Sequence, residues 1–203
     1  NGSGMQVYHF DYDRELGAVF DAAVDEKGDI LLLTYREGAY RIVHCNYRGE
    51  PVSSVDIRFL PGDFEGFVPS RMAYHDGLIY LANQAEMRAV VIDTAGSFTR
   101  GYDFAVMLTL SDQERADAGI GGFTVDNKGN MLFTIGALGR AYRCSLDGTM
   151  REFGKRGSGP GKFGVPYGIA ADRAGNLLIT DKLRCVILIF NSDLNFVKEF
   201  GVR

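Results

Sequence analysis

The sequence predicts an all-β protein built from four similar repeats, each of which holds four short antiparallel strands. The first observation is a tight turn that recurs with a glycine at Gly28, Gly77, Gly129 and Gly175. These glycines are separated by 49, 52 and 46 residues. The second observation is that each turn lies between two short apolar runs. A period of about 50 residues with four antiparallel strands is typical of one blade of a β-propeller.

The last quarter of the chain shows the repeat most clearly. A glycine-rich loop, Gly154–Gly164, is followed by a small-residue run that ends at the turn Asp172–Asn176. Two apolar runs and a more polar one, Phe196–Phe200, come next, separated by turn residues. Four short strands fit into this stretch and leave no room for a helix.

Corresponding strands can be assigned in all four repeats. The first strands are rich in small residues and lie at 22–24, 72–74, 123–125 and 169–171. The second strands are almost wholly apolar and lie at 30–33, 78–81, 131–135 and 177–179. Continuous apolarity predicts that the second strands are buried on both faces, between neighbouring blades.

The third strands end at equivalent positions, which are Cys45, Ile92, Cys144 and Phe190. Two cysteines therefore occupy the position that an isoleucine and a phenylalanine occupy in the other two repeats. We interpret these cysteines as small buried hydrophobes and not as reactive thiols. The fourth strands, near 52–57, 98–104, 150–153 and 196–200, are more polar, which is typical of a strand at the outer edge of a blade.

Two segments depart from the repeat. Residues 109–118 carry Ser111 with Glu114 three positions later, a capping-box spacing that predicts a short helix ending at Gly119. Apolar and polar residues alternate over Val7–Asp11, which predicts a single strand within residues 5–12. We assign this strand to a blade whose other strands lie elsewhere. The sequence leaves three arrangements open: a four-bladed ring with an extra strand, part of a five- or six-bladed ring, or two chains that complete each other.

The prediction is thus one β-propeller domain over residues 1–203, with blades near residues 19–68, 69–119, 120–165 and 166–203. The net charge of −4 disfavours broad affinity for nucleic acids or anionic membranes. No run of eighteen apolar residues is present, so we expect no membrane-spanning segment. Three cysteines without a C-x-x-C pair indicate neither a disulfide framework nor a zinc knuckle.

The segment Gly154–Gly201 resembles an NHL repeat, whose pattern joins a glycine-rich loop, F-x-x-P-x-G-[IV]-A-x-D-x-x-G-N and V-F-x-x-x-G. The matching residues are Phe163, Pro166, Gly168, Ile169, Ala170, Asp172, Gly175, Asn176 and Asp181. The Asn-His pair that names the family is replaced here by Arg184 and Cys185, and the arginine that follows it is replaced by Val186.

The resemblance implies a β-propeller, commonly six-bladed, that serves chiefly as an interaction platform. A few related propellers are metal-assisted lyases or calcium-dependent lactonases. Bacterial proteins that resemble this chain are often exported, so a periplasmic or cell-envelope location is slightly preferred over the cytoplasm.

No residues form a recognisable catalytic or metal-binding set, and we predict neither catalytic residues nor a cofactor. His9, His44 and His75 are expected at strand edges or in a turn, away from any central metal. Asp25, Asp126 and Asp172 recur in step with the blades, which favours a structural role in their own turns. The glycine-rich loop lacks the G-K-[ST] ending and the helix of a phosphate-binding loop.

The candidate binding surface is a mildly basic face made by the loops that join second to third strands and one blade to the next. Its candidate residues are Arg36, Arg88, Arg140, Lys155, Arg156, Lys162, Lys182 and Arg184. We predict a non-enzymatic propeller that engages a protein or another acidic ligand through this face. A solvated rim of mixed charge explains the same residues equally well.

The alternative is a metal-dependent hydrolase or lyase with its site in the central funnel. A homo-oligomer that completes the propeller is a further partner that the incomplete repeat suggests. RNA binding, which occurs on some animal relatives, is disfavoured by the acidic balance of the chain.

Overall fold

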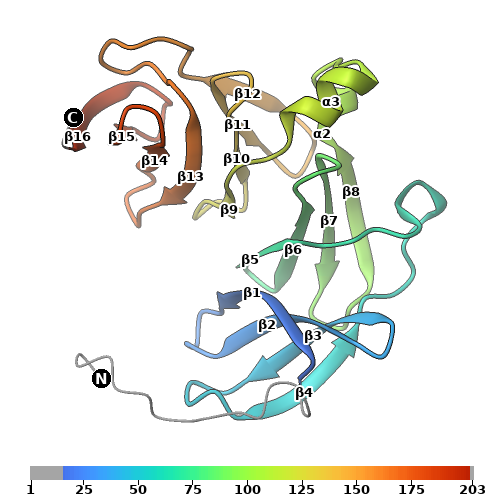
Figure 1. The fold of residues 1–203 in the computed structure, drawn as a ribbon. Coiled ribbons are helices and arrows are strands. Elements are labelled where there is room, and N and C mark those ends of the chain that lie inside the picture. Colours follow the sequence, from blue (N-terminus) through green and yellow to red (C-terminus); the bar gives the residue numbers. More distant parts are fainter. Residues whose placement is uncertain (1–15, 202–203) are drawn as a thin grey trace. The chain divides into compact units, whose positions relative to one another are not determined.

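The computed structural model describes residues 16–201. The predicted strand Val7–Asp11 lies outside the described residues. Within them the chain forms four antiparallel sheets, each made of four strands that follow one another in the sequence (Figure 1). This arrangement confirms the predicted all-β fold with four repeats, and we number the sheets blades 1 to 4.

The strands of each blade are as follows. Blade 1 contains β1 (Ala18–Val24), β2 (Ile30–Arg36), β3 (Ala39–Cys45) and β4 (Pro51–Asp56). Blade 2 contains β5 (Arg71–His75), β6 (Leu78–Asn83), β7 (Arg88–Asp93) and β8 (Phe98–Asp103). Blade 3 contains β9 (Phe123–Val125), β10 (Met131–Ile135), β11 (Arg140–Cys144) and β12 (Met150–Phe153). Blade 4 contains β13 (Pro166–Ala171), β14 (Leu177–Asp181), β15 (Val186–Phe190) and β16 (Phe196–Gly201).

The chain divides into two compact units, which are described separately. Unit 1 comprises residues up to Leu81 together with Val90–Thr99, and unit 2 comprises Ala82–Ala89 together with the residues from Arg100 onward. The core of unit 1 gathers apolar side chains of blades 1 and 2, among them Leu33, Ile42 and Ile79. The core of unit 2 gathers side chains of blades 3 and 4, among them Leu132 and Phe190. Whether residues 1–203 form one domain stays a prediction.

The apolar second strands are buried as expected. Every residue of β10 is buried, since its two faces contact different neighbours. One face of blade 3 approaches blade 4 so closely that the Thr134 hydroxyl accepts the N–H of Gly122 at 2.9 Å and donates to the carbonyl of Tyr167 at 2.6 Å. The polar fourth strands β4 and β16 are mostly exposed, which agrees with an outer position.

The third-strand cysteines Cys45 and Cys144 are fully buried, as predicted, and all three cysteines are free thiols. Burial raises the pKa of the Cys144 thiol to about 11, so it is protonated and unreactive at neutral pH. Cys185 is exposed in the turn between β14 and β15.

The predicted helix is α3 (Asp112–Ala118), with the capping box between Ser111 and Glu114 in place. Two short elements were not predicted: α2 (Phe104–Met107), which Asp103 caps by accepting the Val106 N–H, and the 3-10 helix η1 (Gly62–Phe64). Neither is longer than one turn, so neither leaves a periodic pattern in the sequence. Among the described residues, no helix has the length and apolarity needed to cross a membrane.

Candidate functional site

Asp181 joins the glycine-rich loop to the turn between β14 and β15. The carboxylate is only 3% exposed. Its two oxygens accept the N–H groups of Gly164 at 2.6 Å and Val165 at 3.1 Å. The same carboxylate accepts the N–H groups of Leu183 at 3.1 Å and Arg184 at 2.9 Å. These bonds hold the loop and the turn together as one surface, at the end of β14.

Arg184 fastens this surface to the outer strand of blade 4. Its guanidinium donates to the carboxylate of Glu199 on β16 at 2.9 and 2.5 Å, and to the carbonyl of Lys162 at 2.6 Å. The Arg184 side chain is 6% exposed. Hydrogen bonding to Glu199 raises the pKa of Arg184 above its ordinary value, so the pair is an ionic one. The charge of Arg184 is therefore largely balanced within the fold.

A cleft of about 720 Å³ opens between the glycine-rich loop and the turn. We call it the blade-4 cleft; its lining comprises Arg156, Gly157, Ser158, Phe163, Gly164, Val165, Leu183, Arg184 and Cys185. Phe163 is fully buried beneath it, whereas Leu183 is 71% exposed at its edge. Arg156 is exposed, and its guanidinium donates to the carbonyl of Ala137 in the turn between β10 and β11.

Basic residues are frequent on the two segments that form the cleft, although only Arg156 and Arg184 among them line it. The loop residues 154–166 and the turn residues 182–185 contain no Asp or Glu, but they carry Lys155, Arg156, Lys162, Lys182 and Arg184. The Lys182 ammonium lies 3.5 Å from the ring centroid of Tyr167, a cation–π contact. Five of the eight candidate residues therefore lie on these two joined segments.

Several backbone N–H groups of the glycine-rich loop already have hydrogen-bond acceptors. The N–H of Gly157 bonds the carbonyl of Phe163, and the N–H of Phe163 bonds the carbonyl of Lys155. The N–H groups of Gly164 and Val165 bond Asp181. The loop connects β12 to β13, and these four N–H groups are already hydrogen-bonded within blade 4 and its connecting loop.

The other three candidates belong to other segments of the chain. Arg36 belongs to unit 1 and lies 3.3 Å from the carboxylate of Glu37. Arg140 lies 3.7 Å from Glu152. Arg88 lies 3.3 Å from Asp103, which Arg115 of α3 also contacts at 2.7 Å. Each of these arginines thus has an acidic neighbour in its own unit.

Asp103 shows how the acidic group beside Arg88 is stabilised. Burial alone would raise the pKa of Asp103, but the N–H of Val106 and the guanidinium groups of Arg115 and Arg88 together outweigh it. The pKa of Asp103 therefore lies below its ordinary value, and the carboxylate is ionised at neutral pH.

The recurring aspartates have the structural role that the sequence predicted. Asp126 accepts the N–H groups of Lys128 and Asn130 at 2.9 and 3.0 Å. Asp172 accepts the N–H groups of Ala174 and Asn176 at 2.9 and 2.8 Å. Hydrogen bonding, chiefly from Asn176, lowers the pKa of Asp172. Each carboxylate closes its own hairpin turn.

Two of the three histidines lie in the described part of the chain. His44 lies within β3 as expected. His75 is the last residue of β5, directly before the turn and not in it. His9 falls outside the described residues.

Sequence reasoning missed two partners of the basic residues. Glu199 was assigned only to a polar outer strand, and Tyr167 was given no role. Both contacts depend on how the strands of blade 4 pair, because Leu188 pairs with Glu199 and Pro166 with Asp181. No local sequence signal indicates such contacts, since they join segments 15 residues or more apart.

The comparisons with known proteins support the fold. No family model matches the chain. A 62-residue segment, 30% of this chain and 5% of its relative, is 38% identical to Protein lin-41 of Caenorhabditis elegans. This match gives partial support to the NHL resemblance.

Solved structures match nearly the whole chain at low identity. A streptogramin B lyase superposes with a TM-score of 0.62 at 17% identity, over 92% of this chain and 55% of that chain. The virginiamycin B lyase of Staphylococcus aureus, solved with quinupristin, gives 0.60 at 19% identity, over 94% and 57%. A putative 6-phosphogluconolactonase of Bacteroides uniformis gives 0.58 at 13% identity, over 90% and 57%.

These likenesses show the β-propeller fold and nothing finer, because the identities are low. The chain spans a little more than half the length of each of these three structures.

Proposed function

We propose that this chain belongs to an NHL-type propeller that acts as a binding platform and holds an acidic protein segment in the blade-4 cleft. The observation that carries the proposal is the cleft itself, a hollow of about 720 Å³ that combines an apolar lining with an exposed arginine. Pockets that bind ligands typically combine apolar walls with a few well-placed polar groups.

Electrostatics support an anionic ligand. The two segments that form the cleft carry five basic residues and no acidic ones. Arg184 is balanced by Glu199, whereas Lys155, Arg156, Lys162 and Lys182 are exposed. A local excess of positive charge on an acidic chain attracts an anionic segment and orients it.

Arg156 is the residue we expect to contact the ligand directly. Its guanidinium donates to a neutral carbonyl and, among the described residues, forms no ion pair with a carboxylate. A guanidinium can bind a carboxylate with two parallel hydrogen bonds, which a lysine cannot do. Leu183, which is exposed and also lines the cleft, offers an apolar contact to a flanking side chain of the same segment.

The test is a binding assay with a fluorescein-labelled peptide of sequence Glu-Glu-Leu-Glu-Glu, followed by fluorescence anisotropy. We expect saturable binding that weakens as salt increases, and at least about tenfold weaker binding for the double variant Arg156→Glu and Lys182→Glu. The matched control reverses two exposed charges outside the cleft, Arg151→Glu and Arg173→Glu, and should bind as the unmodified chain does.

Two further arms decide the ligand class. The neutral peptide Gln-Gln-Leu-Gln-Gln should not bind, and equal binding of both peptides would overturn the electrostatic proposal. Tighter binding of a sulfated oligosaccharide than of the acidic peptide would overturn the choice of a protein ligand. Unchanged binding in the cleft double variant would overturn the location.

The second candidate function is that of a lyase or a hydrolase. It is favoured by the structural likeness to a streptogramin B lyase and to a putative 6-phosphogluconolactonase. Chromatography of quinupristin incubated with the chain, with and without a divalent cation, tests this candidate. Conversion that a chelator abolishes would replace the platform proposal, and an unchanged substrate would count against the lyase.

A further inference from the structure

The turn between first and second strands differs in one respect between blade 1 and blades 3 and 4. In blades 3 and 4 the residue after the turn glycine is Asn130 or Asn176. The amide of Asn130 donates to the Asp126 carboxylate at 2.9 and 3.1 Å, and that of Asn176 donates to Asp172 at 2.8 Å. In both blades a neutral donor therefore satisfies the turn aspartate.

Blade 1 has a carboxylate at this position. Asp29 takes the place of the asparagine, and an ionised carboxylate has no proton to donate. Asp25 still accepts the N–H groups of Lys27 at 2.8 Å and Asp29 at 2.9 Å, so the turn itself is the same. Two carboxylates thus lie close together where the other two blades have a carboxylate and an amide.

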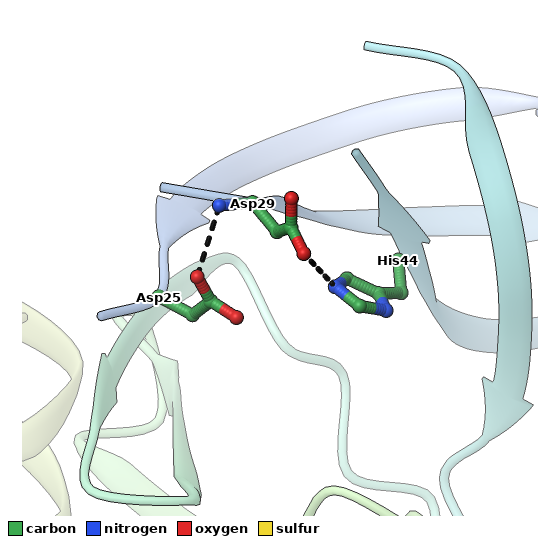
Figure 2. Close-up of side chains that lie close together, drawn as sticks. All are labelled: Asp25, Asp29 and His44. Atoms are coloured by element: carbon green, nitrogen blue, oxygen red, sulfur yellow. Dashed lines mark hydrogen bonds and ion pairs between the residues drawn. The ribbon is translucent and has the colours of Figure 1, made fainter. Parts of the chain in front are cut away.

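The third strand contributes a further difference. The residue before the last one of β11 is Arg143, whose guanidinium lies 3.4 Å from Asp126 and provides a permanent positive charge. The equivalent residue of β3 is His44, whose Nε2 lies 3.4 Å from an oxygen of Asp29. Figure 2 shows the Asp29 carboxylate directed at the imidazole of His44, and the Asp25 carboxylate directed at the backbone nitrogen of Asp29.

The imidazole nitrogen is poorly satisfied by this contact. The Nε2 atom of His44 is buried from solvent, and its approach to Asp29 lacks the geometry of a hydrogen bond. A buried nitrogen without a hydrogen bond is unusual and calls for a further partner. An imidazole nitrogen and carboxylate oxygens are also the kinds of ligand that zinc binds in proteins.

We propose that Asp25, Asp29 and His44 bind one divalent cation of the zinc type. One ligand atom of each residue lies within 4.8 Å of the other two. Tetrahedral zinc with bonds of about 2.0–2.1 Å places its ligand atoms roughly 3.4 Å apart. The contact between Asp29 and His44 already has this length, at 3.4 Å.

The surroundings provide both rigidity and room. Asp25 is held by its turn, and His44 is held by the pairing of β3 with β2, in which it lies opposite Leu31. A cavity of about 230 Å³ lined by Asp25, His44 and Ser53, among others, adjoins the cluster. It leaves space for the solvent ligand that would complete the coordination of three protein ligands.

Equilibrium dialysis against Zn²⁺ tests the site, carried out in a Cys185→Ser background because the exposed thiol also binds zinc. We expect one Zn²⁺ per chain and at least about tenfold weaker binding for Asp29→Asn and for His44→Gln. Asp29→Asn recreates the arrangement of blades 3 and 4, so this variant should fold normally. Co²⁺ substitution should give a visible absorption band that His44→Gln alters.

The matched control is Asn176→Asp, which places a second carboxylate beside Asp172 where the third strand offers Ile189 and no imidazole. This variant should bind no additional Zn²⁺. The proposal is overturned if the unmodified site takes up no Zn²⁺. It is overturned equally if Asp29→Asn and His44→Gln leave both the stoichiometry and the affinity unchanged.

Discussion

The carboxylate of Asp181 accepts the N–H of Gly164 at 2.6 Å. This bond joins the end of β14 to the glycine-rich loop that leads into blade 4. The same buried side chain also accepts the N–H of Arg184. This side chain therefore helps to fix the position of the blade-4 cleft, and its removal leaves one buried and three partly buried N–H groups without this partner.

We expect Asp181→Ala to lower the free energy of unfolding by about 2–4 kcal/mol, because each buried or partly buried N–H group that loses its acceptor costs part of its desolvation energy. Urea denaturation measures the loss. Asp193→Ala, at an exposed turn position of the same blade, should change the stability by less than about 0.5 kcal/mol. Equal losses for the two variants would contradict the role of Asp181.

The ion pair between Arg184 and Glu199 should show strong coupling. Arg184→Leu leaves a carboxylate that is 17% exposed without its main partner, and we expect a loss of about 3 kcal/mol. The double variant Arg184→Leu and Glu199→Leu should recover part of this loss, since no charge is then left unpaired. A double-mutant cycle by urea denaturation with purely additive effects would show that the pair is not coupled.

Asp103 predicts a dependence of stability on acid pH. Its folded-state pKa lies below the ordinary value, because the Val106 N–H and Arg115 outweigh the effect of burial. The stabilisation is therefore fully present above the unfolded pKa of about 3.9 and is lost as pH falls through the folded pKa. Asp103→Asn should lower the stability at pH 7 and flatten its decline below about pH 4. Melting temperatures measured as a function of pH test this prediction. If they fall equally below about pH 4 in the variant and in the unmodified chain, Asp103 does not contribute to the acid dependence.

Gly122 should tolerate no side chain. A Cβ at this position would lie 2.5 Å from the Tyr167 carbonyl and 2.8 Å from the Ile169 nitrogen, both of them backbone atoms of β13. Gly122→Ala is expected to destabilise unit 2 by about 2 kcal/mol or more, since the strands must separate. Gly62→Ala is the control, because nothing lies within 4 Å of its Cβ. Similar melting temperatures for the two variants would contradict this close approach.

The fold was accessible from the sequence because its signals are local. Turn glycines, alternating apolar runs and the capping box at Ser111 each depend on neighbouring residues, and the structure confirms the strands and the helix that they predict. The elements that were missed, α2 and η1, are single turns without periodicity.

The candidate site was less accessible, because its contacts join distant segments. The sequence indicated basic loops, but it did not show that Arg184 is bound by Glu199 or that Lys182 lies on Tyr167. The sequence also offered no reason to consider Asp25 and His44 together. An aspartate in place of the asparagine, at Asp29, suggests a metal site only when a histidine on another strand lies close to it.

The central claim is that the blade-4 cleft binds an acidic segment, and amide chemical shifts in ¹⁵N-labelled protein test it most directly. Titration with the peptide Glu-Glu-Leu-Glu-Glu should shift the amide signals of Gly157, Ser158 and Leu183, which line the cleft. The signals of Gly175 and Asp193, in the turns at the opposite end of the β14 and β15 strands, should stay in place. Shifts confined to other surfaces, or no shifts at saturating peptide, would contradict the account.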